Sequence, residues 1–173
     1  MTGSGAAAPA RRALRALPLL ALAAGVAGLP GARAADAAPP AYPAGATAYQ
    51  ANCAVCHGAS GAGLPSLAPP LLSYPARYAA SPEGRRQLAI TVLYGMYGDV
   101  AVEGKHYAFR MPEFGQLDDA SLAAVLNFVV FDLAHAGAGV QRLAPAEIAA
   151  ERAHPLDGAE VREHRKRVAP EEP

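Results

Sequence analysis

Five consecutive residues constrain the fold of this chain more than any other feature. They read Cys53-Ala54-Val55-Cys56-His57 and contain the two cysteines of the 173-residue sequence. On a helix, Cys53 lies three positions before Cys56 and four before His57, so the three side chains share one face. We therefore expect two thiols and one imidazole to meet at a single site.

Cys-x-x-Cys-His is the sequence to which c-type haem is attached. Two thiols at this spacing can add to the two vinyl groups of a haem, while the imidazole reaches an iron that accepts a proximal histidine. Three other interpretations are weaker. A zinc site needs four Cys or His ligands, usually as two pairs, a thioredoxin-like pair expects a βαβ context, and a structural disulfide does not require His57. The motif predicts one covalent haem c, held through Cys53 and Cys56.

Residues 1–34 are typical of an export signal. Arg11 and two further arginines precede a leucine-rich stretch, and Ala32-Arg33-Ala34 places small residues where a signal peptidase cleaves. Arg15 and Pro18 interrupt the apolar stretch, whereas a membrane-spanning helix needs about 20 predominantly apolar residues. We expect a cleaved signal and a periplasmic mature protein with no stable membrane span. An uncleaved signal would instead anchor the protein to the membrane.

The charge balance changes when the predicted signal is set aside. The whole chain carries 15 basic and 15 acidic side chains. Residues 1–34 contain four of the basic side chains and none of the acidic ones, which leaves 11 against 15 and a net charge of −4. Nucleic-acid binding relies on a basic surface, so we expect no nucleic-acid partner.

The rest of the chain alternates between helical patterns and loops rich in glycine and proline. No stretch alternates convincingly between apolar and polar residues, so the sequence predicts an all-α domain over 44–137, preceded by a linker over 35–43. The predicted helices run over 44–55, from a cap at Ser81 to Gly95, and from a cap at Asp118 to Gly137, with irregular loops over 58–80 and 96–116.

A charged tail, residues 138–173, contains a repeat with a period of 13 residues. Leu143-x-x-Ala146-Glu147-Ile148 recurs as Leu156-x-x-Ala159-Glu160-Val161. Each copy has room for two or three helical turns, and isolated helices of that length are marginal in water. The tail is therefore either partly disordered, or docked on the domain or on a partner.

Further residues surround the motif in a characteristic order. They are Gly45 and Tyr49 before it, then Gly61, Gly63, Pro69-Pro70-Leu71 and Met111-Pro112, and finally Val125 and Phe128. In this order and spacing, residues 42–137 resemble the class I monohaem c-type cytochromes. The resemblance implies a small cytochrome c fold, with about four helices and long loops wrapped around one covalent haem. It also implies that the first and last helices cross closely.

The resemblance also implies the remaining contacts to the haem. In that family the second axial ligand is a methionine that precedes a proline shortly before the last helix, which corresponds to Met111 opposite His57. A thioether in this position raises the reduction potential. A proline carbonyl about twelve residues downstream accepts a hydrogen bond from the ligating histidine, which corresponds to Pro69, with Pro70 as the shifted alternative. Leu71 would then pack on the haem edge.

Other side chains compete for the sixth coordination position. Met96 is the reserve candidate, although it is equally typical of a residue that fills gaps in a core. His106 would give bis-histidine ligation and a lower potential. His135 lies near a helix end, where a cation is favoured by the dipole. Candidates for the haem carboxylates, each of which is also interpretable as a surface side chain, are Tyr94, Tyr97, Tyr107, Arg77, Arg85, Arg86 and Arg110.

These features favour a single-electron carrier with no catalytic residues of its own. With His57 and Met111 both bound, no coordination position remains open for oxygen or peroxide. The expected partners are redox proteins, such as a dehydrogenase or a terminal oxidase or reductase. One alternative is a dedicated cytochrome subunit of a periplasmic dehydrogenase complex, held by the tail over 138–173. Another is a haem enzyme or gas sensor with an open sixth position, which requires that Met111 does not bind.

Overall fold

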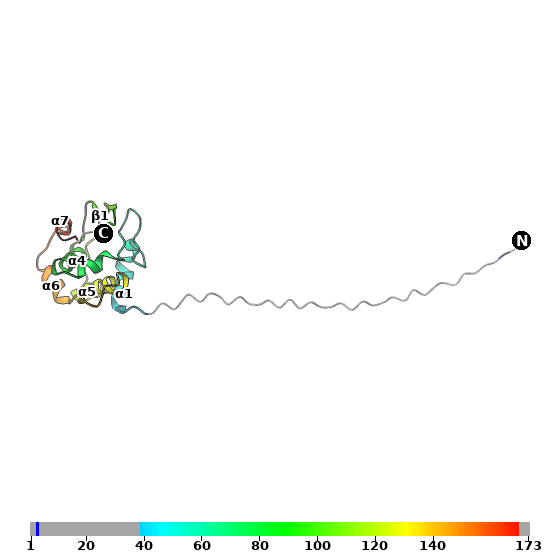
Figure 1. Ribbon diagram of the computed structural model, residues 1–173, viewed down its shortest axis with the longest axis horizontal. Helices are drawn as coiled ribbons and strands as arrows, with labels where there is room; N and C mark the ends of the chain where they lie inside the picture. The colour runs from blue at the N-terminus through cyan, green and yellow to red at the C-terminus, as the bar shows by residue number, and fades with distance from the viewer. Residues whose placement is uncertain (1–2, 4–38, 170–173) are drawn as a thin grey trace. The chain divides into compact units, whose positions relative to one another are not determined.

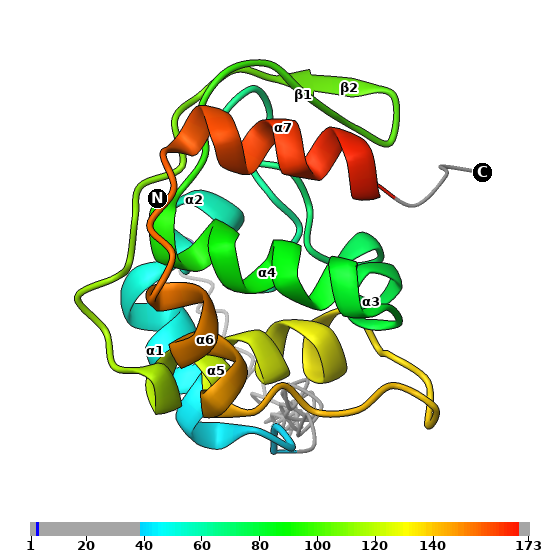
Figure 2. The same cartoon turned by 90° about the vertical axis from the view of Figure 1, so that its left-hand side faces the viewer.

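The computed structural model describes residue 3 and residues 39–169, shown in Figures 1 and 2. The predicted export signal lies outside these residues apart from Gly3, as do the first four residues of the predicted linker. Among the described residues, no helix combines the length and the apolar content that crossing a membrane requires. The elements, in chain order, are α1 (Pro43–Asn52), α2 (Ala54–His57), α3 (Tyr74–Ala79), α4 (Pro82–Tyr94), β1 (Val100–Val102), β2 (Lys105–Tyr107), α5 (Asp119–Asn127), the π-helix η1 (Phe128–Leu133), α6 (Pro145–Arg152) and α7 (Gly158–Val168).

Two of the helices begin at the caps that the sequence predicts. At the start of α4, the backbone N–H of Gly84 donates a hydrogen bond to Ser81 Oγ over 3.1 Å. At the start of α5, the N–H of Ser121 donates to Asp118 Oδ1 over 2.6 Å. Such caps satisfy backbone donors that have no partner inside the helix. Gly95 ends α4, as predicted. The mainly helical fold class is confirmed.

Helix boundaries elsewhere differ from the prediction. The helix expected over 44–55 is divided at Cys53 into α1 and α2. The loop expected over 58–80 contains the short helix α3. The last helix of the predicted domain changes to π-helical geometry and ends at Leu133 rather than at Gly137. His135 follows with a left-handed backbone, φ 51°, which a continuing right-handed helix cannot contain.

A short β-hairpin was not expected from the sequence. Val100 pairs with Tyr107 and Val102 with Lys105 in an antiparallel register. Glu103 and Gly104 form the turn, and both have positive φ, as two-residue hairpin turns require. Strands of three residues are too short to show the alternation by which strands are recognised. The all-α prediction was therefore wrong at this point.

The close approach of α1 to the last helix depends on a glycine. A side chain at Gly45 would collide with the backbone carbonyl of Ala124 on α5. Beside it, the rings of Tyr49 and Phe128 lie 5.3 Å apart between their centroids, tilted at 53°. With Val125 they belong to one buried apolar cluster. The predicted crossing of the first and last helices of the domain is confirmed.

The C-terminal segment, defined here as Val140–Val168, packs against the rest of the domain. Figure 2 shows α7 lying alongside α4 and α6 lying near α4 and α5. Leu143, Ile148 and Val161 are almost completely buried. The described residues 39–169 fall within a single compact unit. Of the arrangements considered for the tail, the structure has the one docked on the domain.

Candidate haem site

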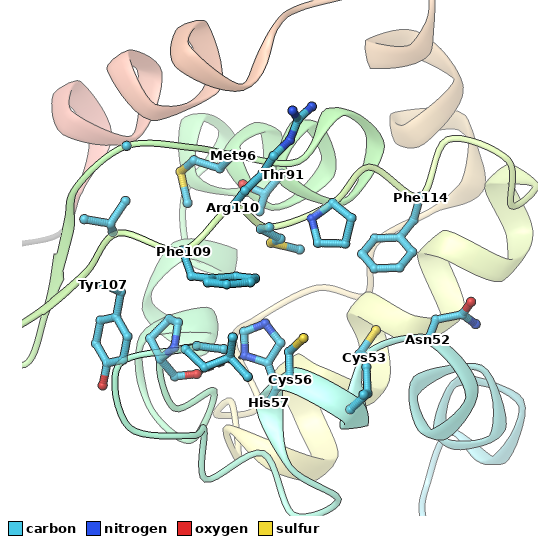
Figure 3. Close-up of a pocket in the computed structure, with 18 of the residues that line it drawn as sticks. Asn52, Cys53, Cys56, His57, Thr91, Met96, Tyr107, Phe109, Arg110 and Phe114 are labelled. Atoms are coloured by element: carbon cyan, nitrogen blue, oxygen red, sulfur yellow. Dashed lines mark hydrogen bonds between the residues drawn. The ribbon is translucent and has the colours of Figure 1, made fainter.

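A deep cleft opens beside α2. Its outer lobe encloses about 880 Å³ and is lined by side chains from α2, the end of α4, the hairpin and the segment from Phe109 to Phe114. An inner lobe of about 640 Å³ shares Cys53, His57 and both cleft methionines with the outer one. In Figure 3, Cys56 and His57 lie on one side, Met96 and Arg110 on the other, and Phe109 and Phe114 at the flanks. The lining is almost entirely apolar, which suits a large flat hydrophobic cofactor.

His57 is held in one orientation at the wall of the cleft. Its side chain belongs to a residue only 8 % exposed, and Nδ1 lies 2.9 Å from the carbonyl oxygen of Pro69. A carbonyl only accepts hydrogen bonds, so Nδ1 carries the proton and Nε2 keeps its lone pair. Burial lowers the pKa of His57, and the bond to Pro69 partly opposes that shift. At neutral pH the imidazole is therefore uncharged and suited to bind a metal ion.

A tight loop returns the chain from His57 to Pro69. The N–H of Gly63 donates to the carbonyl of His57 over 2.8 Å, and the N–H of Leu71 donates to that of Gly61 over 2.7 Å. Gly63 has φ +75°, and a side chain there would meet the backbone around Pro69. Only glycine tolerates both conditions at low cost. The glycine-rich sequence after the motif thus places the carbonyl that orients His57.

The two cysteines line the cleft beside His57 and are not bonded to each other. Burial raises the pKa of Cys53 to about 11, and the neighbouring Cys56 adds to the shift. The thiol is therefore protonated at neutral pH, whereas zinc binding and disulfide exchange both need a thiolate. Within residues 39–169, no group of three or more His, Cys, Asp or Glu side chains could hold a metal ion. The donor set and the apolar lining fit a covalent haem.

Met96 and Met111 lie side by side in an isolated antiparallel bridge. The N–H of Met96 donates to the carbonyl of Met111 over 3.1 Å, and the reverse bond measures 2.9 Å. Directly opposed residues of such a pair project their side chains to the same side. Both methionines line both lobes of the cleft. Met96 thus shares the site assigned to Met111.

The two histidines considered as ligands do not reach the cleft. His106 is exposed on the hairpin, and its Nδ1 lies 2.8 Å from Asp99 Oδ2. His135 is exposed in the turn after η1. Neither of them lines either lobe.

Leu71 lies at the inner end of the site. It is buried in the cluster of Tyr49, Val125 and Val129, and it lines the inner lobe with them. Its position places an apolar side chain between the cleft and the crossing of α1 with the last helix.

The candidates for the haem carboxylates divide into two groups. Tyr107 and Arg110 line the outer lobe. Arg85, Arg86 and Tyr94 instead bind the C-terminal segment. Arg85 Nη2 donates to Glu147 Oε2 over 2.6 Å, Arg86 Nε to Glu151 Oε2 over 3.0 Å, and Tyr94 Oη to the carbonyl of Glu151 over 2.8 Å. Arg77 and Tyr97 line neither lobe.

Several residues that line the cleft were not identified from the sequence. Tyr74 and Thr91 line both lobes, and Phe109 and Phe114 line the outer one. Arg165, from α7, lines the inner lobe. The two phenylalanines flank Met111 in the sequence, and that proximity is the one signal that could have indicated them.

A comparison with known protein families identifies the fold. The family model described as Cytochrome c matches residues 42–130, about half of the chain. The chain belongs to the cytochrome c family. Haem c, attached covalently, is the cofactor of this family, and Cys53 and Cys56 have the spacing that one such haem requires.

Two curated relatives show the same similarity. Cytochrome c-552 of Thermus thermophilus is 42% identical over 79 residues, which cover 46% of this chain and 60% of the relative. A second cytochrome c-552, from another strain record of Thermus thermophilus, is also 42% identical over 79 residues, covering 46% of this chain and 53% of the relative. The match thus spans a little over half the length of each relative.

Proposed function

We propose that this protein is a periplasmic single-electron carrier whose haem c is ligated by His57 and Met111. The observation that carries the proposal is the arrangement at the cleft. His57 has Nδ1 bonded to Pro69 and Nε2 available, and Met111 lines the same cleft. Met111 is preferred to Met96 because it stands before Pro112, ahead of the α5 cap, where the family resemblance places the axial methionine.

Bound haem supplies an iron that accepts and releases one electron. The part of the protein is to fix and tune that centre. The bond to Pro69 keeps His57 in one tautomer and one orientation. The Met111 thioether fills the remaining axial position, so that small molecules do not bind. The apolar lining, including Phe109 and Phe114, excludes water and disfavours the additional positive charge of the oxidised state.

Electrons need a route between the cleft and other proteins. Val55 and Phe109 line the outer lobe and are also exposed to solvent, so they form an apolar rim around its mouth. Redox encounters typically bury small surfaces. A dehydrogenase that delivers electrons and a terminal oxidase or reductase that receives them would dock there in turn.

Visible spectra of Met111→Ala and Met96→Ala test the ligand assignment. We expect Met111→Ala to lose the low-spin spectrum and its ferrous form to bind carbon monoxide rapidly. Met96→Ala is the matched control, because its side chain lines the same cleft, and it should keep the low-spin spectrum and exclude carbon monoxide.

The reverse pattern would assign Met96 as the ligand. Rapid carbon monoxide binding by the unaltered ferrous protein would contradict the electron carrier and favour a sensor or enzyme.

A further inference from the structure

One basic side chain reaches the inner lobe of the cleft from the C-terminal segment. Arg165 lies on α7, which packs beside α4 and near the β1–β2 hairpin in Figure 2. Its Nη1 donates to Tyr78 Oη over 2.8 Å and its Nη2 to the carbonyl of Ala101 over 3.2 Å. The guanidinium carbon lies 5.7 Å from the ring centroid of Tyr74 and 5.6 Å from that of Tyr78. These contacts fix Arg165 at the cleft.

Arg165 is half-buried without a carboxylate beside it. Within residues 39–169, no carboxylate oxygen lies within ion-pair distance of its guanidinium, unlike Arg85, Arg86 and Arg152. No aspartate or glutamate lines either lobe of the cleft. A guanidinium carries five N–H donors in a planar fork that matches a carboxylate. The site therefore holds an uncompensated positive charge.

Tyr74 adds a second donor at the same place. It lines both lobes, and its ring packs against Arg165 and against the edge of the Tyr78 ring. Among the described residues, its hydroxyl makes no hydrogen bond. A buried hydroxyl normally finds a partner. The haem brings two carboxylates into an apolar cleft, where an unpaired charge would be costly.

We infer that Arg165 and Tyr74 bind one carboxylate of the haem, so that the C-terminal segment completes the cofactor site. The family match ends at residue 130, so it assigns no role to Arg165. The inference rests on haem c being held in this cleft and is independent of which methionine is the axial ligand.

Arg110 is the other guanidinium at the cleft, in a different environment. It is exposed at the outer lobe and lies 5.4 Å from the ring centroid of Tyr97. Charges at the surface are screened by solvent and salt, whereas buried ones are screened much less. Arg165 should therefore have the larger effect on the haem.

The reduction potential of the holoprotein measures this effect. A cation paired with the haem carboxylate disfavours the oxidised, more positive state, so its removal should lower the potential. For Arg165→Gln we expect the equilibrium between the reduced and oxidised forms to shift about tenfold, which is 59 mV for a one-electron couple. Without Arg165, protonation of the carboxylate should also make the potential depend on pH between about pH 5 and 8.

Lys166→Gln is the matched control, because it removes the same charge from the neighbouring position. Lys166 is 56 % exposed and bonds to Glu163 over 2.9 Å. We expect it to shift the equilibrium less than about twofold, as an exposed charge does. Equal shifts in Arg165→Gln and Lys166→Gln, with no added pH dependence in either, would overturn the inference.

Arg165→Lys keeps the charge and loses the planar fork. We expect a smaller shift than in Arg165→Gln and a potential that stays independent of pH. If Arg165→Gln is not recovered as holoprotein, a shift in Arg165→Lys larger than in Lys166→Gln supports the inference, and an equal shift overturns it. A shift in Arg165→Lys as large as in Arg165→Gln would assign the effect to lost packing and would also overturn it. All of these readings hold whether Met111 or Met96 binds the iron.

Discussion

The haem-attachment segment, Pro43–Leu71, and the C-terminal segment, Val140–Val168, border the same cleft and are built in opposite ways. In the first, short-range backbone bonds do the work. The loop after His57 closes through bonds to the His57 and Gly61 carbonyls, with Gly63 tightening the turn. In the second, side chains of the domain reach across long sequence separations. Asn127 holds the backbone of Leu143 in both directions, over 2.9 and 2.8 Å.

Ionic contacts extend this difference. Arg85 binds Glu147 and also the carbonyl oxygens of Gln141 and Arg142, the latter two over 2.6 and 2.9 Å. From the segment itself, Arg152 binds Asp119 over 2.8 Å. A segment fixed at so many points behaves as part of the core rather than as an appendage. The comparison teaches that the sequence region matched by the family and the folding unit of this protein have different limits.

The largest expected effect comes from the core of the C-terminal segment. Ile148 is 0 % exposed and belongs to the main apolar cluster with Leu93 and Leu126. Ile148→Ala should lower the free energy of unfolding by about 2–5 kcal/mol, because it leaves a cavity in a packed core. Chemical denaturation of the holoprotein measures the change.

The conservative variant Ile148→Val should cost only about 0.5–1.5 kcal/mol. A loss below that range in Ile148→Ala would show that the segment is an appendage after all, and the comparison would fail.

A smaller effect is expected where a polar side chain anchors the segment. Asn127→Ala removes both bonds to Leu143 and leaves a buried N–H and a buried carbonyl without partners. Each such group costs about 1–3 kcal/mol when unpaired, and local adjustment should bring the total loss to about 1–3 kcal/mol. Denaturant midpoints, together with hydrogen exchange at Leu143, measure it.

Asn52→Ala is the control from the haem-attachment segment. The Asn52 amide donates over 2.9 Å to the carbonyl of Ala48, four residues earlier on the same helix. Its removal leaves no buried group unpaired, so we expect a loss of less than about 1 kcal/mol. Equal losses in Asn52→Ala and Asn127→Ala would show that the two segments are anchored alike.

The difference between the segments also explains what the sequence could predict. Local signals identify Cys53, Cys56 and His57 by their spacing, and they locate the caps at Ser81 and Asp118. Each of these depends on residues no more than four positions apart.

The C-terminal anchors have no local signal. Arg165 bonds to Tyr78 across 87 positions, and Asn127 to Leu143 across 16. Until the chain is folded, nothing distinguishes such side chains from surface residues, and Arg85 was therefore considered for the haem rather than for Glu147. The 13-residue repeat indicated that helices could form over 143–165, without showing which surface they would cover.

The smallest expected effect concerns pH. His164 on α7 is 7 % exposed, and its Nδ1 lies 2.6 Å from Gln87 Oε1 on α4. Burial lowers the pKa of His164, and the positive charges of Arg86 and Arg167 lower it further. The unfolded chain, with an ordinary pKa of about 6.5, then binds a proton more readily than the folded protein. Stability should therefore fall as the pH drops through about 6.5 towards the lower pKa of the folded state.

His164→Gln removes this titration while keeping an amide that can bond to Gln87. Unfolding midpoints of both proteins at about pH 7.5 and 5.5 should show a smaller acid loss in the variant. Because the two proteins differ at one titrating group, the other histidines cancel in this comparison. Equal acid losses would mean that protonation of His164 does not loosen α7, and that the contacts of Arg165 hold the helix in place on their own.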